Sequence, residues 1–533
     1  MNVRLYINTL RYLKASQIWH QAIFRLETVM KKVLGADRSL RKYYKEGRPV
    51  LLSPPVPHKR TYLGNDEFCI INVCHKFTEW DDDSMDALWL YNLNYMDFIL
   101  QDDIDKTEAL GWIMRFIGDI PANSRFSEPY PVSLRCMNWI KFVSLNSDSV
   151  PEDKKRTIDT LLYSQLKWLS RHTEKRLLAN HYLENGFALL FGSVYFGDAK
   201  LFAQADYILR SQLDEQILED GAHCELSPMY HCIMTERVLD CVNLLSGQSY
   251  PLGPKAEMLL SFLSSVASRM LGWLTAMVPA DRNIPLFGDS ALDIAVEPSA
   301  LYEYAGRLNV KIEKGILGAS GYRLIASELY NLWFDVGNVG LSYNAGHAHA
   351  DTLSFIMDVM DKPFLVDSGV STYNACDRRF YERSTEAHNT VCVNGRNSSS
   401  VWGAFRCAER CSVTVLHDDD DYISASHNGF AGYGVECFRS IRKNADGIVV
   451  EDRLCGDADN VTPEAFFYLS PNVRVIETDG DSVRTEVADI RFAGAYGIKV
   501  ENVCVSERYN MLEQTSRIRV SFTQALTTII TIV

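Results

Sequence analysis

Hydrophobic positions recur with a helical period in the first part of the chain and with a period of two in the last part. Within residues 152–170 the apolar positions are Ile158, Leu161, Leu162, Leu166 and Leu169. This i, i+3, i+4 spacing gives one apolar face on a helix. Further segments of the same kind are expected near 84–103, 107–118, 134–146, 180–196, 198–216, 229–246 and 256–276. Because their connections are short, neighbouring helices should run antiparallel, as in a bundle or an α/α toroid.

The pattern changes after about residue 314. Leu353, Phe355, Met357 and Val359 alternate with more polar neighbours, and Asp-, Asn- and Gly-rich turns separate this segment from others like it. Alternation of this kind predicts strands with one buried face. A run of helices followed by a run of strands predicts two domains, the second an antiparallel β-sandwich. We therefore expect an N-terminal segment over 1–83, an (α/α) toroid over 84–312 and a β-sandwich over 313–533.

Composition narrows the classes of function. The chain has 533 residues, too many for one ordinary core, and is 47% hydrophobic and 23% charged. Its net charge of -14 argues against nucleic acid as a partner. A polyanionic substrate would therefore need a locally basic cleft. The 13 cysteines show no framework spacing, so reduced and mostly buried thiols are expected.

The N-terminal residues 5–33 form an amphipathic pattern rich in Arg and Lys. We expect a solvated helix packed on the body rather than membrane contact. No signal-peptide pattern and no apolar run long enough for a membrane span is evident. A cytoplasmic location is therefore expected, with a periplasmic or surface-associated one as the alternative, and no organic cofactor is predicted.

Three histidines fall within residues 344–394. His349, Asp367 and His388 together offer two imidazoles and a carboxylate, a common ligand set for zinc. Their wide spacing means that adjacent strands would have to bring them together. The alternative is that these side chains only hydrogen-bond turns. Spacing alone leaves both interpretations open.

Two earlier segments carry polar groups at helix starts. Asn180, His181 and Glu184 share one helical face, although Asn180 is equally suited to be an N-cap. Pro228 fits a first helical turn and places Tyr230 near an electropositive helix N-terminus, although Tyr230 also fits an apolar stripe.

A fourth group precedes His388. Tyr373 and Tyr381 lie near Arg378, Arg379 and Arg383. Guanidinium groups bind carboxylates and tyrosines stack on sugars, so this segment is a candidate for substrate contact. The alternative is an ordinary surface loop.

Together these segments resemble a known family. The stretches G-H-A-H-A-D (346–351), V-D-S-G (366–369) and A-H-N-T-V (387–391), with the Asn180 and Tyr230 segments before them, resemble the heparinase II/III-like polysaccharide lyases. The resemblance covers the chain from about residue 84 onward. It implies an incomplete α/α toroid followed by an antiparallel β-sandwich.

The resemblance also implies an activity, the cleavage of uronate-containing polysaccharides by β-elimination. Asn180 and His181 would hold the uronate carboxylate. Tyr230 would be the acid, and also the base where C5–H and O4 lie on the same side, while His347 is the other candidate base. Glu184, Tyr373 and Arg383 would contact substrate. Glu184 could also orient His181. His349, Asp367 and His388 would bind a structural Zn²⁺ that keeps the His347 loop rigid.

Other functions remain open. A glycoside hydrolase on a toroid needs two carboxylates at the cleft, and Glu184, Glu225 and Asp289 are the candidates. A non-catalytic glycan-binding protein, or a partner in surface-polysaccharide biosynthesis, would retain the fold without turnover. A cupin-like oxidative metal site is a further alternative for the three histidines.

Overall fold

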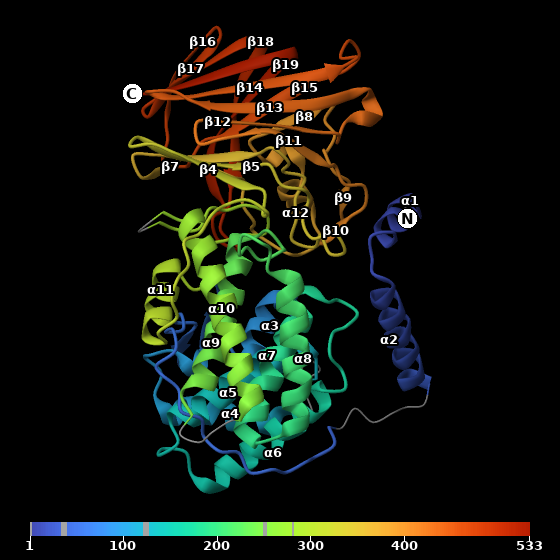
Figure 1. The fold of residues 1–533 in the computed structure, drawn as a ribbon, viewed down its shortest axis with the longest axis vertical. Coiled ribbons are helices and arrows are strands. Elements are labelled where there is room, and N and C mark those ends of the chain that lie inside the picture. The colour runs from blue at the N-terminus through green and yellow to red at the C-terminus, as the bar shows by residue number, and fades with distance from the viewer. Residues whose placement is uncertain (1–2, 34–39, 121–126, 249–252, 280–281) are drawn as a thin grey trace.

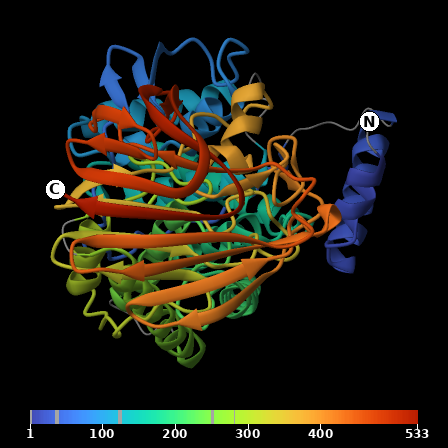
Figure 2. The same ribbon diagram turned by 90° about the horizontal axis from the view of Figure 1, so that it is seen from above.

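The computed structural model describes residues 3–33, 40–120, 127–248, 253–279 and 282–533. Its body has a helical part and a β-sheet part, one above the other in Figure 1. The helical part contains α3 (Ala87–Tyr95), α4 (Lys106–Asp119), α5 (Pro129–Leu145), α6 (Glu152–Leu169), α7 (Ala179–Phe196), α8 (Ala199–Gln216), α9 (Pro228–Ser246), α10 (Pro254–Met277) and α11 (Pro298–Arg307). Two more helices, α1 (Val3–Leu10) and α2 (Ala15–Val33), lie along one side of the body (Figures 1 and 2).

Polar side chains determine where several helices begin. Asp105, Asp198 and Ser227 accept hydrogen bonds from backbone N–H groups in the first turns of α4, α8 and α9. These N–H groups have no partner within the helix, so such caps stabilise each helix start. Pro228 is the first residue of α9, as the sequence predicts.

Consecutive helices pack against each other around an apolar core. α7 contacts both α5 and α8, and α9 contacts α10. The predicted stripe of α6 is buried at Ile158, Leu162 and Leu166. Among the described residues, α10 alone is long and apolar enough to cross a membrane, but 56% of its most apolar window is buried within the protein. We therefore assign α10 to the core of the helical domain.

The sheet part has two main layers, and every strand pairing in them is antiparallel. One layer is the four-stranded sheet β4 (Tyr322–Ala326), β5 (Tyr330–Asp335), β6 (Phe355–Val359) and β7 (Lys362–Leu365). The other is a ten-stranded sheet of β8 (Val391–Val393), β11 (Val413–Asp418), β12 (Tyr422–His427), β13 (Val435–Lys443), β14 (Gly447–Gly456), β15 (Pro463–Tyr468), β16 (Val475–Asp479), β17 (Ser482–Thr485), β18 (Ala488–Val505) and β19 (Glu513–Ile532). Side chains of both layers, such as Phe355 and Ile441, form one buried cluster. The predicted order of a helical domain and then an antiparallel β-sandwich is confirmed.

The structure adds strands that the alternation does not reveal. β16 is almost entirely exposed, and bulges between Ala493 and Gly497 interrupt the alternation of β18. A small sheet of β1 (Tyr62–Gly64), β2 (Glu67–Ile70) and β3 (Val73–Lys76) precedes the helical domain, and β9 (Val401–Trp402) pairs with β10 (Arg406–Cys407) near the cleft. Cys69 and Cys74 face each other across β2 and β3 and form a disulfide, which corrects the expectation that the cysteines are all reduced.

Candidate active site

A cleft of about 1430 Å³ lies between the helical domain and the sheets. Its walls include residues of α2, α5, α7 and α9. The sandwich domain contributes loop residues 344, 346, 347, 373 and 405, and residue 406 of β10. The four residues proposed for catalysis, Asn180, His181, Tyr230 and His347, all line it. The structure therefore brings side chains from both domains to one cavity.

Tyr230 and His347 meet in this cleft. The centroids of their rings are 4.1 Å apart, and the hydroxyl of Tyr230 lies 3.3 Å from that of Tyr373. Tyr230 is positioned by the Ser227 cap, because its backbone N–H donates to the Ser227 hydroxyl in the first turn of α9. Burial raises the pKa of Tyr230 above its ordinary value, and the hydrogen bond with Tyr373 opposes this rise only in part. Tyr230 is therefore protonated at neutral pH and able to donate a proton.

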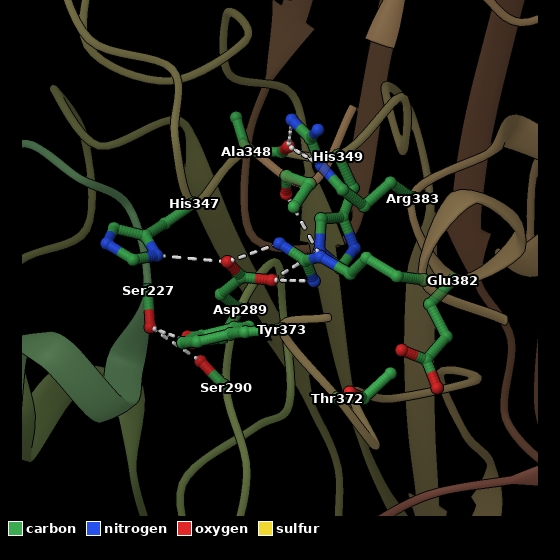
Figure 3. A network of polar contacts seen from close by, with 12 residues as sticks. Ser227, Asp289, Ser290, His347, Ala348, His349, Thr372, Tyr373, Glu382 and Arg383 are labelled. Atoms are coloured by element: carbon green, nitrogen blue, oxygen red, sulfur yellow. Dashed lines mark hydrogen bonds and ion pairs between the residues drawn. The ribbon is translucent and has the colours of Figure 1, made fainter. Parts of the chain in front are cut away.

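Asp289 lies behind His347 and is completely buried (Figure 3). Nδ1 of His347 donates to one carboxylate oxygen at 2.9 Å, and Nε2 of His349 donates to the other at 2.8 Å. Arg379 donates to both oxygens, at 2.5 and 2.8 Å. Burial tends to raise the pKa of Asp289, but Arg379 and the two histidines outweigh it and hold this pKa well below its usual value. The carboxylate is thus charged, and it leaves Nε2 of His347 as the free acceptor of that ring.

Asn180 and His181 begin α7 at another part of the cleft wall. Leu178 and Ala179, just before them, have φ of 59° and 48°, a strained backbone for residues other than glycine. The buried side-chain oxygen of Asn180 has no hydrogen-bond partner. Nδ1 of His181 lies 3.2 Å from Glu174 Oε1. Burial lowers the pKa of His181, but the Glu174 carboxylate outweighs this effect, so the pKa lies above its ordinary value.

Glu184 does not have the role proposed for it. Its side chain is completely buried, does not line the cleft and pairs with Arg237 at 3.3 Å. Glu184 is one helical turn beyond His181, and this position directs it into the interior of the helical domain. Glu174, in the loop before α7, is the carboxylate that pairs with His181.

Arg383 is also a structural residue rather than a substrate contact. It is 1% exposed and donates to the backbone carbonyls of Ala348, Gly403 and Arg406. It therefore supports the backbone next to His347 from behind. Of the three substrate-contact candidates, only Tyr373 lines the cleft.

A group that could hold a metal ion lies behind the cleft. Ligand atoms of His349, Asp351 and His388 are all within 4.8 Å of one another. The buried Nδ1 of His349 and Nε2 of His388 have no hydrogen-bond partner, which fits two imidazole ligands. Asp367 is not in this group. Its carboxylate accepts from Nδ1 of His388 at 2.7 Å, so it orients a histidine of the group, and Asp351 takes the place expected for Asp367.

Models of known protein families match both domains of this chain. One family model, described as "Heparinase II/III N-terminus", matches residues 132–306, and another, "Heparinase II/III-like, C-terminal", matches residues 315–533. A heparin-sulfate lyase of Pedobacter heparinus is 23% identical over 262 residues. This match covers 43% of the present chain and only 39% of the relative.

Solved structures share the fold at low sequence identity. A crystal structure of heparinase III has a TM-score of 0.65 at 16% identity, covering 86% of this chain and 80% of that one. A mutant of the heparan sulfate lyase HepC from Pedobacter heparinus has a TM-score of 0.58 at 17% identity, with 88% and 81% covered. Since the two family models lie side by side and span most of the chain, the chain belongs to the heparinase II/III-like polysaccharide lyase family.

Proposed function

We propose that this protein cleaves an acidic, uronate-containing polysaccharide by β-elimination. The observation that carries the proposal is the meeting of Tyr230 and His347, from different domains, in the cleft that Asn180 and His181 also line. The relatives named above are described as heparin- or heparan-sulfate lyases, which supports a uronate substrate.

Elimination first requires removal of a weakly acidic proton from C5 of the uronate. We assign this step to Nε2 of His347, because the bond from Nδ1 to Asp289 places the proton of the neutral ring on Nδ1 and leaves Nε2 as the acceptor. Asp289 also stabilises the imidazolium that forms when Nε2 accepts the C5 proton. Its charge and position act through His347, so Asp289 is a positioning residue.

The second step breaks the bond between C4 and the glycosidic oxygen O4. The electron pair left by the C5 proton forms the C4=C5 double bond, and the C4–O4 pair departs with O4. We assign Tyr230 as the acid that protonates O4, because its hydroxyl is protonated and its ring lies against that of His347. No water enters the products.

The uronate carboxylate must be neutralised so that negative charge can develop next to it. His181 suits this role because the nearby Glu174 favours its charged form. Asn180 adds an uncharged donor, because its side chain lines the cleft and carries an amide NH2 group. Arg171, Lys175 and Arg176 line the same side of the cleft and supply the local positive charge that a polyanion needs in this acidic protein.

A metal ion fits behind this site. His349, Asp351 and His388 would hold it, and imidazole and carboxylate ligands are typical of zinc. When bound, the ion would rigidify the segment that carries His347, two residues from His349. Asp289 contacts both of these histidines, so it links the metal group to the proposed base.

Hydrolysis is less well supported. The carboxylates considered for it, Glu184, Glu225 and Asp289, are not among the described residues that line the cleft, and Asp289 is occupied by Arg379 and two histidines. Three carboxylates line the described part of the cleft, those of Glu27, Glu128 and Glu174. Glu128 and Glu174 bind Tyr91 and His181, which leaves Glu27 as a single carboxylate. No free pair of carboxylates is therefore presented to a substrate by the described part of the cleft.

The test is incubation of the protein with a panel of uronate polymers of both C5 configurations. We expect ultraviolet absorbance from the double bond conjugated to the carboxylate, and no such absorbance with His347→Ala. New reducing ends without the absorbance would overturn elimination. Binding of a polymer without any turnover would instead support the non-catalytic alternative.

A further inference from the structure

The helix α2 presents an apolar stripe to solvent. The exposed apolar residues on one face of this helix are Ala15, Ile18, Trp19, Ala22, Leu26, Val29 and Met30. Their i, i+3, i+4 spacing places them on one continuous stripe. Trp19 is 66% exposed and Leu26 is 64% exposed. A large contiguous apolar surface of this kind marks an interaction site rather than a solvated face.

The shorter helix α1 repeats the arrangement. Val3, Ile7 and Leu10 follow i, i+4, i+7 spacing and are 62%, 60% and 51% exposed. We call these three residues and the seven residues of α2 named above the apolar stripe.

The other sides of both helices contact the body mainly through polar groups, with the ring of Tyr6 against that of Trp402 as an aromatic contact of α1. Gln17 of α2 is buried and donates to the carbonyl of Leu177, and Lys14, just before α2, pairs with Glu215 at 2.7 Å. In α1, Arg4 and Asn8 both bind Glu409 of the sandwich domain. A surface helix normally turns its apolar side to the core and its polar side outward. Both helices pack on the body, as the sequence predicts, but they turn their apolar side to the solvent rather than to the body.

Charge favours one kind of partner for this surface. Residues 1–33 contain six Lys and Arg residues and one Glu, whereas the whole chain carries a net charge of -14. Arg4 and Lys14 pair with acidic residues of the body, and the remaining four basic residues and one Glu give a net charge of +3. Arg25 is exposed and lies on the helix next to the margin of the stripe. Helices that combine a Trp- and Leu-containing apolar side with basic residues bind in the plane of anionic bilayers.

We infer that α1 and α2 dock this protein on an anionic lipid surface through the apolar stripe. The inference goes beyond the proposed function and does not depend on it. It does have a consequence for the cleft, because His20, Ile23 and Phe24 on another side of α2 line that cavity. Docking would hold the cleft close to the bilayer, where it could receive a glycan attached to or emerging from the membrane.

Flotation of the full chain with lipid vesicles tests this inference. We expect binding to vesicles of phosphatidylcholine with phosphatidylglycerol, weaker binding to phosphatidylcholine alone, and loss of binding at high salt. The double variant Trp19→Ser/Leu26→Ser should bind the anionic vesicles at least about tenfold more weakly, because both side chains would enter the bilayer.

The matched control removes an exposed aromatic and an exposed aliphatic residue elsewhere. Tyr207 of α8 and Met258 of α10 are 68% and 65% exposed, so Tyr207→Ser/Met258→Ser should bind vesicles like the unchanged protein. Failure of the full chain to bind anionic vesicles, or equal binding by the Trp19/Leu26 variant, would overturn the inference. Equal affinity for the two vesicle types would overturn the assignment to an anionic surface. A dimer in light scattering that the Trp19/Leu26 variant disperses, without vesicle binding, would assign the stripe to a second copy of the chain.

Discussion

At the scale of single residues, the site depends on two groups with different protonation. Tyr230 carries its proton at neutral pH, as tyrosines ordinarily do, and burial raises its pKa further. Nε2 of His347 can accept a proton because Asp289 binds Nδ1. The two side chains therefore suit the acid and the base of one elimination. Tyr373, whose hydroxyl contacts that of Tyr230, offers a comparison because it lines the same cleft without an assigned proton transfer.

Replacement of Tyr230 by Phe removes the proposed acid and little else. We expect kcat to fall by about 10²- to 10⁴-fold with a small change in KM, since the lost hydroxyl acts in the transition state. Tyr373→Phe should mainly raise KM. Steady-state kinetics on a uronate polymer measure both, and a Tyr230→Phe protein with unchanged kcat would remove Tyr230 from the mechanism.

Asp289→Asn tests the positioning of His347. Arg379 would lose its charged partner, so we expect the free energy of unfolding to fall by about 3–5 kcal/mol. We also expect kcat to fall by roughly 10²-fold or more, with KM nearly unchanged, because an amide does not stabilise the imidazolium.

Asp452 provides the matched control. It is 1% exposed and binds Arg439 at 2.7 and 3.1 Å within the sandwich. Asp452→Asn should lower the unfolding free energy similarly and leave kcat unchanged. Equal kcat losses in the two variants would show that Asp289 acts only through stability.

Buried neutral histidines make stability depend on pH. Burial lowers the pKa of His231 to about 3 and that of His427 to about 4, from 6.5 when unfolded. Nδ1 of His231 accepts a hydrogen bond from the backbone N–H of His223, so protonation of Nδ1 would break this bond. At a pH between the folded and unfolded pKa values, the unfolded chain therefore binds more protons than the folded protein. The stabilisation is complete above pH 6.5 and is lost as the pH falls below it.

Each of these two histidines should remove about 1 kcal/mol of stability between pH 7 and pH 5.5. Denaturant unfolding at the two pH values measures this loss, and His231→Gln should reduce it. Equal loss in that variant would exclude His231 as a source.

At the scale of elements, the segment around His347 is held from behind by other segments. Arg383 binds the carbonyl of Ala348, and Asp289 binds His347 and His349. His349 is also in the group that could hold a metal. The local order of this segment should therefore depend on the ion.

Removal of bound metal by a chelator should lower both the melting temperature and kcat, and added zinc should restore them. His388→Ala should show both losses without chelator, since it removes a ligand from the group of His349 and Asp351. Metal analysis of the purified protein identifies the ion. An untreated protein that holds no metal and is insensitive to chelator would contradict this account of the segment.

Periodicity predicts most elements but not all of them. A helix such as α6 is predictable because its apolar residues form one continuous stripe that is buried. β16 and β18 are not, because exposure and bulges remove the alternation. The partners of the site residues also escape prediction. Glu174 and Asp289 occur in loops without a motif, and only the packing of the two domains brings Asp289 to His347.

At the scale of the whole molecule, the active site exists only because the two domains meet. Asn180 and Tyr230 lie more than a hundred residues before His347, and no local pattern predicts that they share a cleft. The family resemblance predicts this convergence, and the structure brings the three side chains together. The family resemblance also predicts Glu184 and Arg383 as substrate contacts. Both side chains are buried instead, which their residue types do not reveal.

In the proposed reaction, His347 and Tyr230 break the glycosidic bond by elimination. Mass spectrometry of the products from a defined uronate oligosaccharide tests it most directly. Elimination gives two fragments whose masses add up to that of the substrate, with one fragment unsaturated. Fragments whose masses exceed the substrate by one water would contradict it.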